Sequence, residues 1–367
     1  MKKTLIMLIP GLARETRNSQ LASFTEGIMA ASERTPVHEL ADDSTPPGLK
    51  RLVVSKPDGA YELSVIEGYW NDLVPSLTQA PLKTKVIRGI SLLLFWLFSP
   101  IWKGIFARKY LTFGFMLAAL VLVFWYLSTV LLFVEALTEE SADPENGVVA
   151  NVKTFANGTG WKVWLGIGSL MALLPVSLLV DISDFAKRFV TNEPNVAGKP
   201  AVRFEIVRRI REQLLQTLKS DDYTDLIVVG HSFGAVVTVD LMGDLPPLNI
   251  PVRVITMGSL IEILCKQAPW LKEDVESLSQ RPDLVEWLDI NCHADWFASG
   301  ASVPKSPKCR ELFVESYGTF ADRVAARVHS RYFDHQQVVG LILNGPGPLS
   351  EPTPPAEGVE YAEGAVG

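Results

Sequence analysis

A serine between two glycines is the first feature of the sequence that could carry out chemistry. The segment GHSFG at positions 230–234 fits the pattern G-x-S-x-G and follows the β-branched run LIVV at 226–229. On a sharp turn from a strand into a helix, such a serine has a strained backbone, and its neighbours two positions away must lack side chains to avoid collision. The following helix offers N–H groups and a partial positive charge to an oxyanion. The pattern therefore predicts that Ser232 is a nucleophile.

The elements that must position this serine are short apolar strands alternating with helices. We predict strands at Thr4–Ile9, Tyr61–Ile66, Asp225–Val229, Val252–Met257 and Glu286–Ile290. We predict helices at Ser19–Ala31, Pro200–Lys219, Phe233–Met242 and Gln336–Leu343. Strands that alternate with helices indicate an α/β fold with a mostly parallel sheet covered by helices on both faces.

The first thirteen residues, MKKTLIMLIPGLA, allow two interpretations. A basic start followed by an apolar run is typical of a signal peptide. However, Pro10-Gly11 interrupts the run and no clear small-x-small cleavage site follows. We therefore favour a buried strand that ends in a tight turn.

Net charge and cysteine content limit the partners of the chain. The net charge of −7 argues against a nucleic-acid-binding protein. The three cysteines, Cys265, Cys292 and Cys309, have no metal-ligand spacing, and their odd number argues against a disulfide framework. We expect a reducing compartment for the part with the serine, and neither a metal nor another cofactor.

Two long apolar stretches predict a membrane hairpin. Tyr110–Val134 contains no charged residue, and Trp161–Val180 contains one lysine near its start. Each is long enough to cross a bilayer, which needs about 20 residues. Buried core helices are the alternative, but uninterrupted apolar runs of this length are rare in cores.

A shorter apolar stretch at Ile87–Trp102 predicts a helix that lies in the membrane interface. The basic residues around it are Lys83, Lys85, Arg88, Lys103, Arg108 and Lys109. This pattern suits a helix lying on the membrane better than one crossing it. The strands at Thr4–Ile9 and Asp225–Val229 must share one sheet, so the chain must cross the bilayer an even number of times between them. Two crossings satisfy this requirement and three do not.

The distribution of lysine and arginine predicts the orientation of the hairpin. Basic residues precede the first span and follow the second, whereas the loop at 135–160 is mostly acidic. By the positive-inside rule, the loop lies outside and the rest of the chain lies on the cytoplasmic side of an inner or plasma membrane.

These features together resemble the α/β-hydrolase family of serine esterases and lipases. The resemblance covers Met1–Leu77 and Val202–Asn344. It implies one α/β-hydrolase domain built from residues 1–80 and 191–344, with residues 81–190 inserted as the membrane segment. The proline-rich residues 345–367 are predicted to be a disordered tail.

The resemblance also implies a catalytic triad, because the family order is serine, acid, histidine. The stretch VHSRYFDHQQV is similar to the family's histidine segment and favours His329, with His335 as the alternative. The stretch DWFASG resembles the family's acid segment and favours Asp295, with Asp289 as the alternative.

The same resemblance implies an oxyanion hole made by backbone N–H groups of Phe233 and Leu12. Leu12 lies in LIPGLA, which resembles the family's H-G turn with Pro10 in place of the histidine. The stretch TMGSL at 256–260 is similar to a turn of the family that supports the fold.

The expected function is that of a membrane-anchored serine hydrolase that cleaves a lipid or other acyl ester through an acyl-enzyme. An acyltransferase with the same triad and a catalytically silent membrane scaffold are the alternatives. The expected partners are the ester substrate and the membrane.

Overall fold

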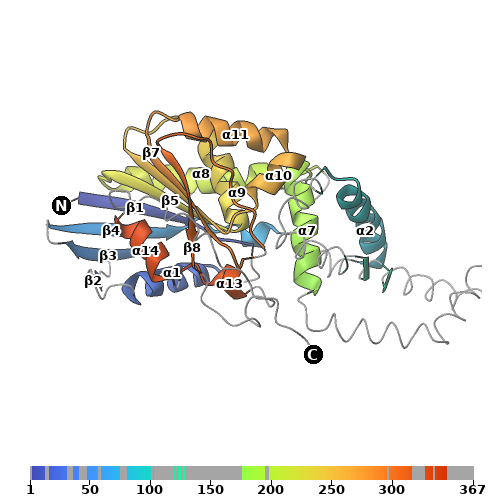
Figure 1. The fold of residues 1–367 in the computed structure, drawn as a ribbon, viewed down its shortest axis with the longest axis horizontal. Helices are drawn as coiled ribbons and strands as arrows, with labels where there is room; N and C mark the ends of the chain where they lie inside the picture. The colour runs from blue at the N-terminus through green and yellow to red at the C-terminus, as the bar shows by residue number, and fades with distance from the viewer. Residues whose placement is uncertain are drawn as a thin grey trace, which may run out of the picture.

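The computed structural model describes a large part of the chain. The described residues are 2–12, 16–30, 36–40, 48–56, 59–74, 81–100, 102, 120, 123–124, 127–128, 176–194, 198–295, 297–315, 327–333 and 335–344. They form an α/β fold with one eight-stranded, mostly parallel sheet (Figure 1).

The strands follow the order β2-β3-β4-β1-β5-β6-β7-β8 across the sheet. Their bounds are β1 (Lys2–Ile9), β2 (Val37–Glu39), β3 (Leu49–Lys56), β4 (Gly59–Glu67), β5 (Asp225–His231), β6 (Val252–Met257), β7 (Leu284–Cys292) and β8 (Cys309–Val314). The pairs from β4 to β8 are parallel, and β2 and β3 add an antiparallel edge.

The first strand, β1, connects the strands that come before and after the long segment at 68–224. β1 pairs in parallel with β4 on one side and with β5 on the other, with Thr4 opposite Asp225. Residues that are more than 200 positions apart therefore share one sheet. The predicted sharing of a sheet by these two strands is confirmed, and Lys2–Ile9 is a central strand.

Helices cover both faces of the sheet, as predicted. One face packs against α7 (Val176–Val190), α8 (Val202–Ser220), α9 (Phe233–Asp244), α10 (Ile261–Gln267) and α11 (Pro269–Gln280). The other face packs against α1 (Ser19–Ala30), α13 (Arg327–Ser330) and α14 (Gln336–Asn344). The alternation of β1 shows the two layers: Leu5, Met7 and Ile9 face the first set of helices, whereas Ile6 and Leu8 face the second.

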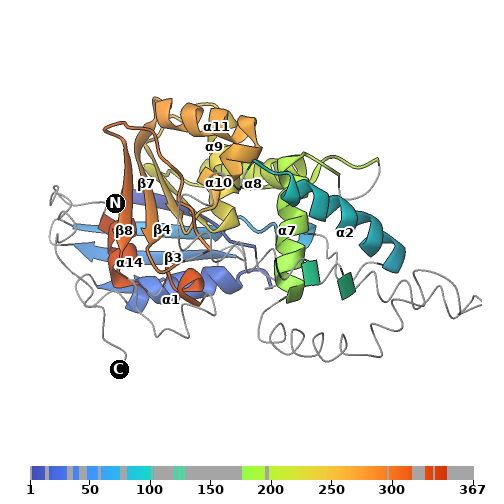
Figure 2. The same cartoon turned by 45° about the vertical axis from the view of Figure 1, so that its right-hand side comes forward.

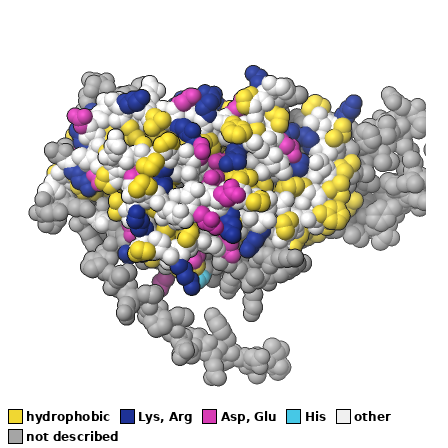
Figure 3. Space-filling model, turned by 90° about the horizontal axis from the view of Figure 1, so that it is seen from above, with side chains coloured by type: hydrophobic (Ala, Val, Ile, Leu, Met, Phe, Trp, Pro, Cys, Tyr) yellow, Lys and Arg dark blue, Asp and Glu magenta, His cyan; other side chains and the backbone are white. Residues whose placement is uncertain are grey.

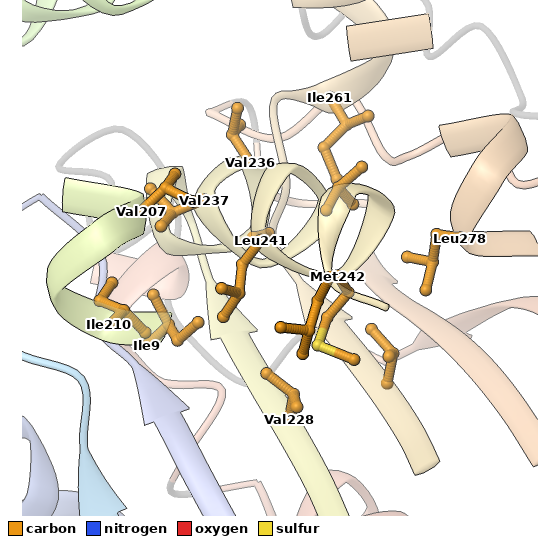
Figure 4. Packing of buried hydrophobic residues seen from close by; sticks show 14 of the residues in the cluster. Ile9, Val207, Ile210, Val228, Val236, Val237, Leu241, Met242, Ile261 and Leu278 are labelled. Atoms are coloured by element: carbon orange, nitrogen blue, oxygen red, sulfur yellow. The ribbon is translucent and has the colours of Figure 1, made fainter. Parts of the chain in front are cut away.

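The helix that follows the serine lies in the centre of the larger core. Every residue of α9 from Phe233 to Met242 is buried, which is typical of a helix that is apolar on all sides. Figure 4 shows Leu241 and Met242 of α9 above Val228 of β5, and Ile210 of α8 beside Ile9 of β1. This packing holds α8 and α9 against the central strands.

The predicted elements of the sheet domain recur with small changes at their ends, but three of its strands and three of its α-helices are additional. β2, β3 and β8 lie at or near the two edges of the sheet, α10 and α11 follow β6, and the short helix α13 precedes α14. β3 and β8 have the sequences LKRLVVSK and CRELFV, in which charged and apolar residues are mixed. Strands that are less covered tolerate charges, and this obscures the apolar run on which the sequence prediction depends.

The predicted membrane spans lie mostly outside the described residues. Of 110–134 the structure describes only 120, 123–124 and 127–128, and of 161–180 it describes 176–180. Among the described helices, none combines the length and the apolar character that crossing a bilayer requires. The second predicted span ends inside α7, whose later residues Phe185 and Phe189 are fully buried in the core. The predicted tail at 345–367 also lies outside the described residues.

The third apolar stretch forms the helix α2 (Leu82–Leu97). A 3₁₀ turn, η2 (Asn71–Leu73), precedes it and lies next to α8. α2 packs against α7, and both views of the ribbon place α7 between the sheet and α2 (Figures 1 and 2).

Candidate active site

Ser232 occupies the turn between β5, which ends at His231, and α9, which begins at Phe233. Its backbone has φ 55° and ψ −124°, in the half of conformational space that L residues rarely adopt. Such a conformation costs roughly 1–3 kcal/mol and persists only where the surrounding structure enforces it. Here the Ser232 N–H donates to the carbonyl of Met257 on β6, which holds the turn in place.

The two glycines of the motif are required by close approach. A Cβ atom at Gly230 would lie 2.3 Å from Oγ1 of Thr238 and 2.7 Å from Cα of Ala235. A Cβ atom at Gly234 would lie 2.2 Å from the carbonyl oxygen of Ile9. The first glycine lets α9 fold back over β5, and the second lets α9 approach the end of β1. This is the packing that the pattern predicts.

Ser232, His329 and Asp295 form one hydrogen-bonded chain. Nδ1 of His329 lies 2.8 Å from Oδ2 of Asp295, and Nε2 of His329 lies 2.7 Å from Oγ of Ser232. An ionised carboxylate only accepts hydrogen bonds, so Nδ1–H donates to Asp295, and in this tautomer Nε2 accepts a hydrogen bond from the Ser232 hydroxyl. The structure thus brings together the three side chains that the sequence analysis favours as a triad.

The alternative residues lie in other environments. Asp289 is fully buried on β7 and accepts hydrogen bonds from Thr256 Oγ1 at 2.5 Å and from the Ala301 N–H at 2.7 Å. Burial raises the pKa of the Asp289 carboxyl. His335 Nε2 bonds the carbonyl of Glu315 at 3.0 Å. The hydrogen bond from the Ala301 N–H ties Asp289 to the loop that follows Asp295. Asp289 therefore has a structural role.

Tyr332 is a member of the site that the sequence analysis missed. Its hydroxyl donates to Asp295 Oδ2 at 3.0 Å and accepts from the Cys292 N–H at 3.1 Å. The Phe297 N–H donates to the other carboxylate oxygen at 3.0 Å. Both oxygens of Asp295 are therefore held, with Oδ2 directed at His329. In the sequence, Tyr332 could have been noticed from its H-x-x-Y spacing from His329.

Gly258 lies directly against Asp295, His329 and Tyr332. It has φ 55°, and a Cβ atom there would lie 3.2 Å from both Asp295 Oδ2 and His329 Cε1, and 2.9 Å from Tyr332. The stretch TMGSL, predicted only to support the fold, therefore also leaves room for the acid and the imidazole.

The predicted second oxyanion donor, the Leu12 N–H, lies in the turn after β1. Asn71 Nδ2 donates to the Gly11 carbonyl at 3.1 Å, and Trp70 Nε1 donates to the Pro10 carbonyl at 3.0 Å. In a planar trans peptide the C=O and the following N–H point in opposite directions, so the Leu12 N–H points away from Asn71. A Cβ atom at Gly11 would lie 3.0 Å from Ser232 Cβ, which places this turn against the serine.

The first predicted oxyanion donor, the Phe233 N–H, lies at the start of α9. A first-turn N–H has no partner within its own helix and is available to an anion. The Phe233 ring packs against two aromatic residues of α7, with centroid distances of 4.9 Å to Phe185 and 5.1 Å to Phe189. Trp70 stacks on Phe185 at 5.2 Å. These four side chains are called the α7 aromatic cluster below.

His231, next to the serine, stabilises the segment that carries His329. Its Nε2–H donates to the His329 carbonyl at 2.8 Å, whereas its buried Nδ1 has no hydrogen-bond partner among the described residues. Burial, and then the nearby His329, lower the pKa of His231 from 6.5 to about 3. The ring is therefore neutral in the folded protein and contributes one donor.

This lowered pKa predicts an acid-sensitive stability. In the unfolded chain the His231 ring takes up a proton below pH 6.5, but in the folded protein it stays neutral down to about pH 3. Its contribution to stability is therefore fully present above pH 6.5 and is lost as the pH falls, by about 1.4 kcal/mol per pH unit. We expect His231→Gln, which keeps an N–H donor, to reduce the loss of stability between pH 6.5 and roughly pH 4 by about 3 kcal/mol.

Unfolding curves at several pH values measure this effect. His38→Gln, at an exposed position on β2, is the control, and an equal change in both variants would contradict the prediction.

No group of three or more His, Cys, Asp or Glu side chains within the described ranges is arranged to hold a metal ion. The three cysteines are free, and Cys292 and Cys309 are buried.

In comparisons with known proteins, the chain matches no protein-family model, no curated protein and no solved structure. The structure itself defines the class of the protein: it is an α/β protein with a mixed, mostly parallel eight-stranded sheet.

Proposed function

We propose that the chain is a serine hydrolase of the α/β-hydrolase type, which cleaves a lipid or other acyl ester through an acyl-enzyme. The observation that carries this proposal is the hydrogen-bonded chain Ser232–His329–Asp295, with distances of 2.7 and 2.8 Å. The strained strand-to-helix turn at Ser232 supports it, because a structural serine does not need such a backbone.

In the proposed first step, Ser232 Oγ attacks the carbonyl carbon of the ester while His329 Nε2 accepts the hydroxyl proton. The negative oxygen of the tetrahedral intermediate accepts hydrogen bonds from the Phe233 and Leu12 N–H groups. The intermediate expels the alcohol, which takes the proton from His329, and the acyl group remains on Ser232. Asp295 keeps the imidazole in the required tautomer and stabilises its positive charge.

In the second step, a water molecule takes the place of the serine hydroxyl. His329 accepts a proton from the water as the oxygen attacks the acyl carbon. Collapse of the second tetrahedral intermediate releases the carboxylic acid, and the proton on His329 returns to Ser232 Oγ. Oδ1 of Asp295 accepts a hydrogen bond from the Phe297 N–H, and this bond keeps the Asp295 side chain in place through both steps.

Covalent labelling tests this proposal. A fluorophosphonate reacts with an activated serine by forming an O–P bond and releasing fluoride. We expect the intact chain to be labelled at Ser232 and the Ser232→Ala variant to remain unlabelled, with the adduct located by mass spectrometry. Ser330→Ala is the control, because Ser330 is exposed and lies next to His329 in the sequence. Equal labelling of the wild type and of Ser232→Ala, or no labelling of folded wild type, would contradict the proposal.

We also propose that residues 110–134 and 161–180 form a membrane hairpin, with the sheet on the cytoplasmic side. The uncharged sequence of the first span and the positions of lysine and arginine support this location. The parallel pairing of β1 with β5 supports an even number of crossings, because both ends of the insertion enter the same sheet. We expect a reporter inserted at 137–160 to register outside and a reporter at the C-terminus to register inside. Detection of both on the same side would overturn the hairpin.

A further inference from the structure

An apolar face of α2 is exposed to solvent from Ile87 to the C-cap residue Phe98. It is formed by Ile87, Ile90, Leu94, Leu97 and Phe98, and is called the α2 stripe here. These side chains are between 40% and 78% exposed. Ile87, Ile90, Leu94 and Leu97 are three or four residues apart, which places them on one side of the helix, and Phe98 follows directly. Figure 3 shows hydrophobic side chains gathered at the end of the molecule where α2 lies. An apolar face of this length marks an interaction surface.

The opposite face of α2 is fixed to the rest of the protein. Arg88 forms an ion pair with Asp184 of α7, and the Trp96 Nε1–H donates to the Ser183 carbonyl at 3.3 Å. Leu92 on the same face is buried. The α2 stripe is therefore held in a fixed direction, away from the sheet, and is not simply the free side of a mobile helix.

Charge identifies the partner of the α2 stripe. Between Leu82 and Lys109 the sequence contains six lysine and arginine residues and no acidic residue. Lys83 near the start of α2 is exposed. Arg88 is paired with Asp184 on the opposite face, and the other five cations precede or follow the stripe in the sequence. An apolar stripe with cations and no acidic residue on either side of it in the sequence is complementary to an anionic lipid surface, where the apolar side chains enter the acyl region and the cations meet the phosphates.

We infer that the α2 stripe lies in the headgroup region of an anionic bilayer leaflet and fixes the orientation of the sheet above it. This inference rests on the proposed membrane location of the chain. It does not depend on the proposed chemistry of Ser232. α7 links the surface to the candidate site, because it contacts α2 through Asp184 and Phe233 through Phe185. A bilayer-resident ester is the substrate class that this arrangement serves.

Fluorescence quenching in lipid nanodiscs tests the inference with the full chain. An environment-sensitive label is placed at Leu94→Cys or Phe98→Cys, in a Cys265→Ser background, since the other two cysteines are buried. We expect brominated lipids to remove about half of the fluorescence, because the apolar face of an interfacial helix is buried about 5–10 Å into the headgroup/acyl boundary. Val285→Cys is the control: it is exposed and lies near Lys2, at the amino ends of the parallel strands. Its label should be quenched by aqueous iodide and not by brominated lipids.

The other outcomes overturn the inference in distinguishable ways. Quenching of the α2 labels by iodide alone would show that the stripe faces water. Protection from both quenchers would show that protein covers it, either a second copy or another part of the chain. Equal lipid quenching in wholly neutral and in anionic discs would overturn the assignment of an anionic leaflet. A folded chain that does not incorporate into discs would overturn the membrane location itself. Ser232 labelling by the fluorophosphonate would be unaffected by any of these results.

Discussion

Replacing His329 by alanine is expected to lower kcat for ester hydrolysis by roughly 10⁴- to 10⁶-fold while the fold is retained. His329 is the only imidazole within the described residues that bonds both Ser232 and an acid, at 2.7 and 2.8 Å. In the proposed mechanism, its removal leaves none of the described side chains bonded to Ser232 Oγ to accept the serine proton. The loss should appear in kcat more than in KM, because the imidazole acts on the transition state and contributes little to binding of the ester. Steady-state hydrolysis of a water-soluble ester measures both constants.

His335→Ala is the matched control for this prediction. His335 lies six positions further along the same segment, and its Nε2 bonds the Glu315 carbonyl. Its substitution should change kcat by less than about threefold, which is the range expected for a position outside the reacting groups. Equal losses in the two variants would indicate that the segment 327–335 acts only through its structure. Circular dichroism of both variants separates a loss of chemistry from a loss of folding.

The substitution Gly234→Ala is expected to destabilise the protein by about 3 kcal/mol or more. Alanine favours helices over glycine, so helix propensity alone predicts a gain in stability at this position within α9. Here a Cβ atom would lie 2.2 Å from the Ile9 carbonyl oxygen and 2.4 Å from that of Pro10. Both neighbours are backbone atoms at the end of the central strand β1, so they cannot move away as a flexible side chain would. We expect thermal unfolding to show a Tm lowered by roughly 6–12 °C.

Gly340→Ala provides a control with the opposite sign. Gly340 lies within α14, and a Cβ atom there would have no neighbour within 4 Å. Alanine then contributes its higher helix propensity without a steric clash, and the free energy of unfolding should rise by about 0.5–1 kcal/mol. A Tm for Gly234→Ala at or above that of the wild type would show that α9 moves freely relative to β1, which would contradict the packing described for the serine turn.

The parallel part of the sheet could be predicted from the sequence because its strands are buried on both faces. Runs such as LIVV in β5 and VRVITM in β6 contain few polar residues, and the strands of this part of the sheet alternate with helices along the chain. β3 could not be predicted in the same way, because Lys50 and Arg51 interrupt its apolar residues. It pairs on one side with the three-residue strand β2 near the edge of the sheet, where charged side chains reach solvent.

The candidate site was predictable where local pattern determines geometry. Ser232 and its glycines are defined by a turn of five residues, and a short segment is enough to indicate them. The favoured partners His329 and Asp295 followed from the resemblance, which orders residues along the chain. Asn71 could not be assigned a role, because it acts through a hydrogen bond to Gly11, 60 positions away. Tyr332 was indicated only by its spacing from His329, and that spacing does not show the hydrogen bond to Asp295, 37 positions away. Such contacts depend on how the whole sheet is assembled.

The α7 aromatic cluster has a mechanical consequence for the two predicted oxyanion donors. Phe233 lies at the start of α9, and Trp70 holds the Pro10 carbonyl of the turn before Leu12, yet the rings of both rest on Phe185. The two N–H groups come from segments more than 200 residues apart, and one helix, α7, supports both segments. A shift of α7 would displace both supports together, so we expect the two predicted oxyanion donors to keep their separation when α7 moves.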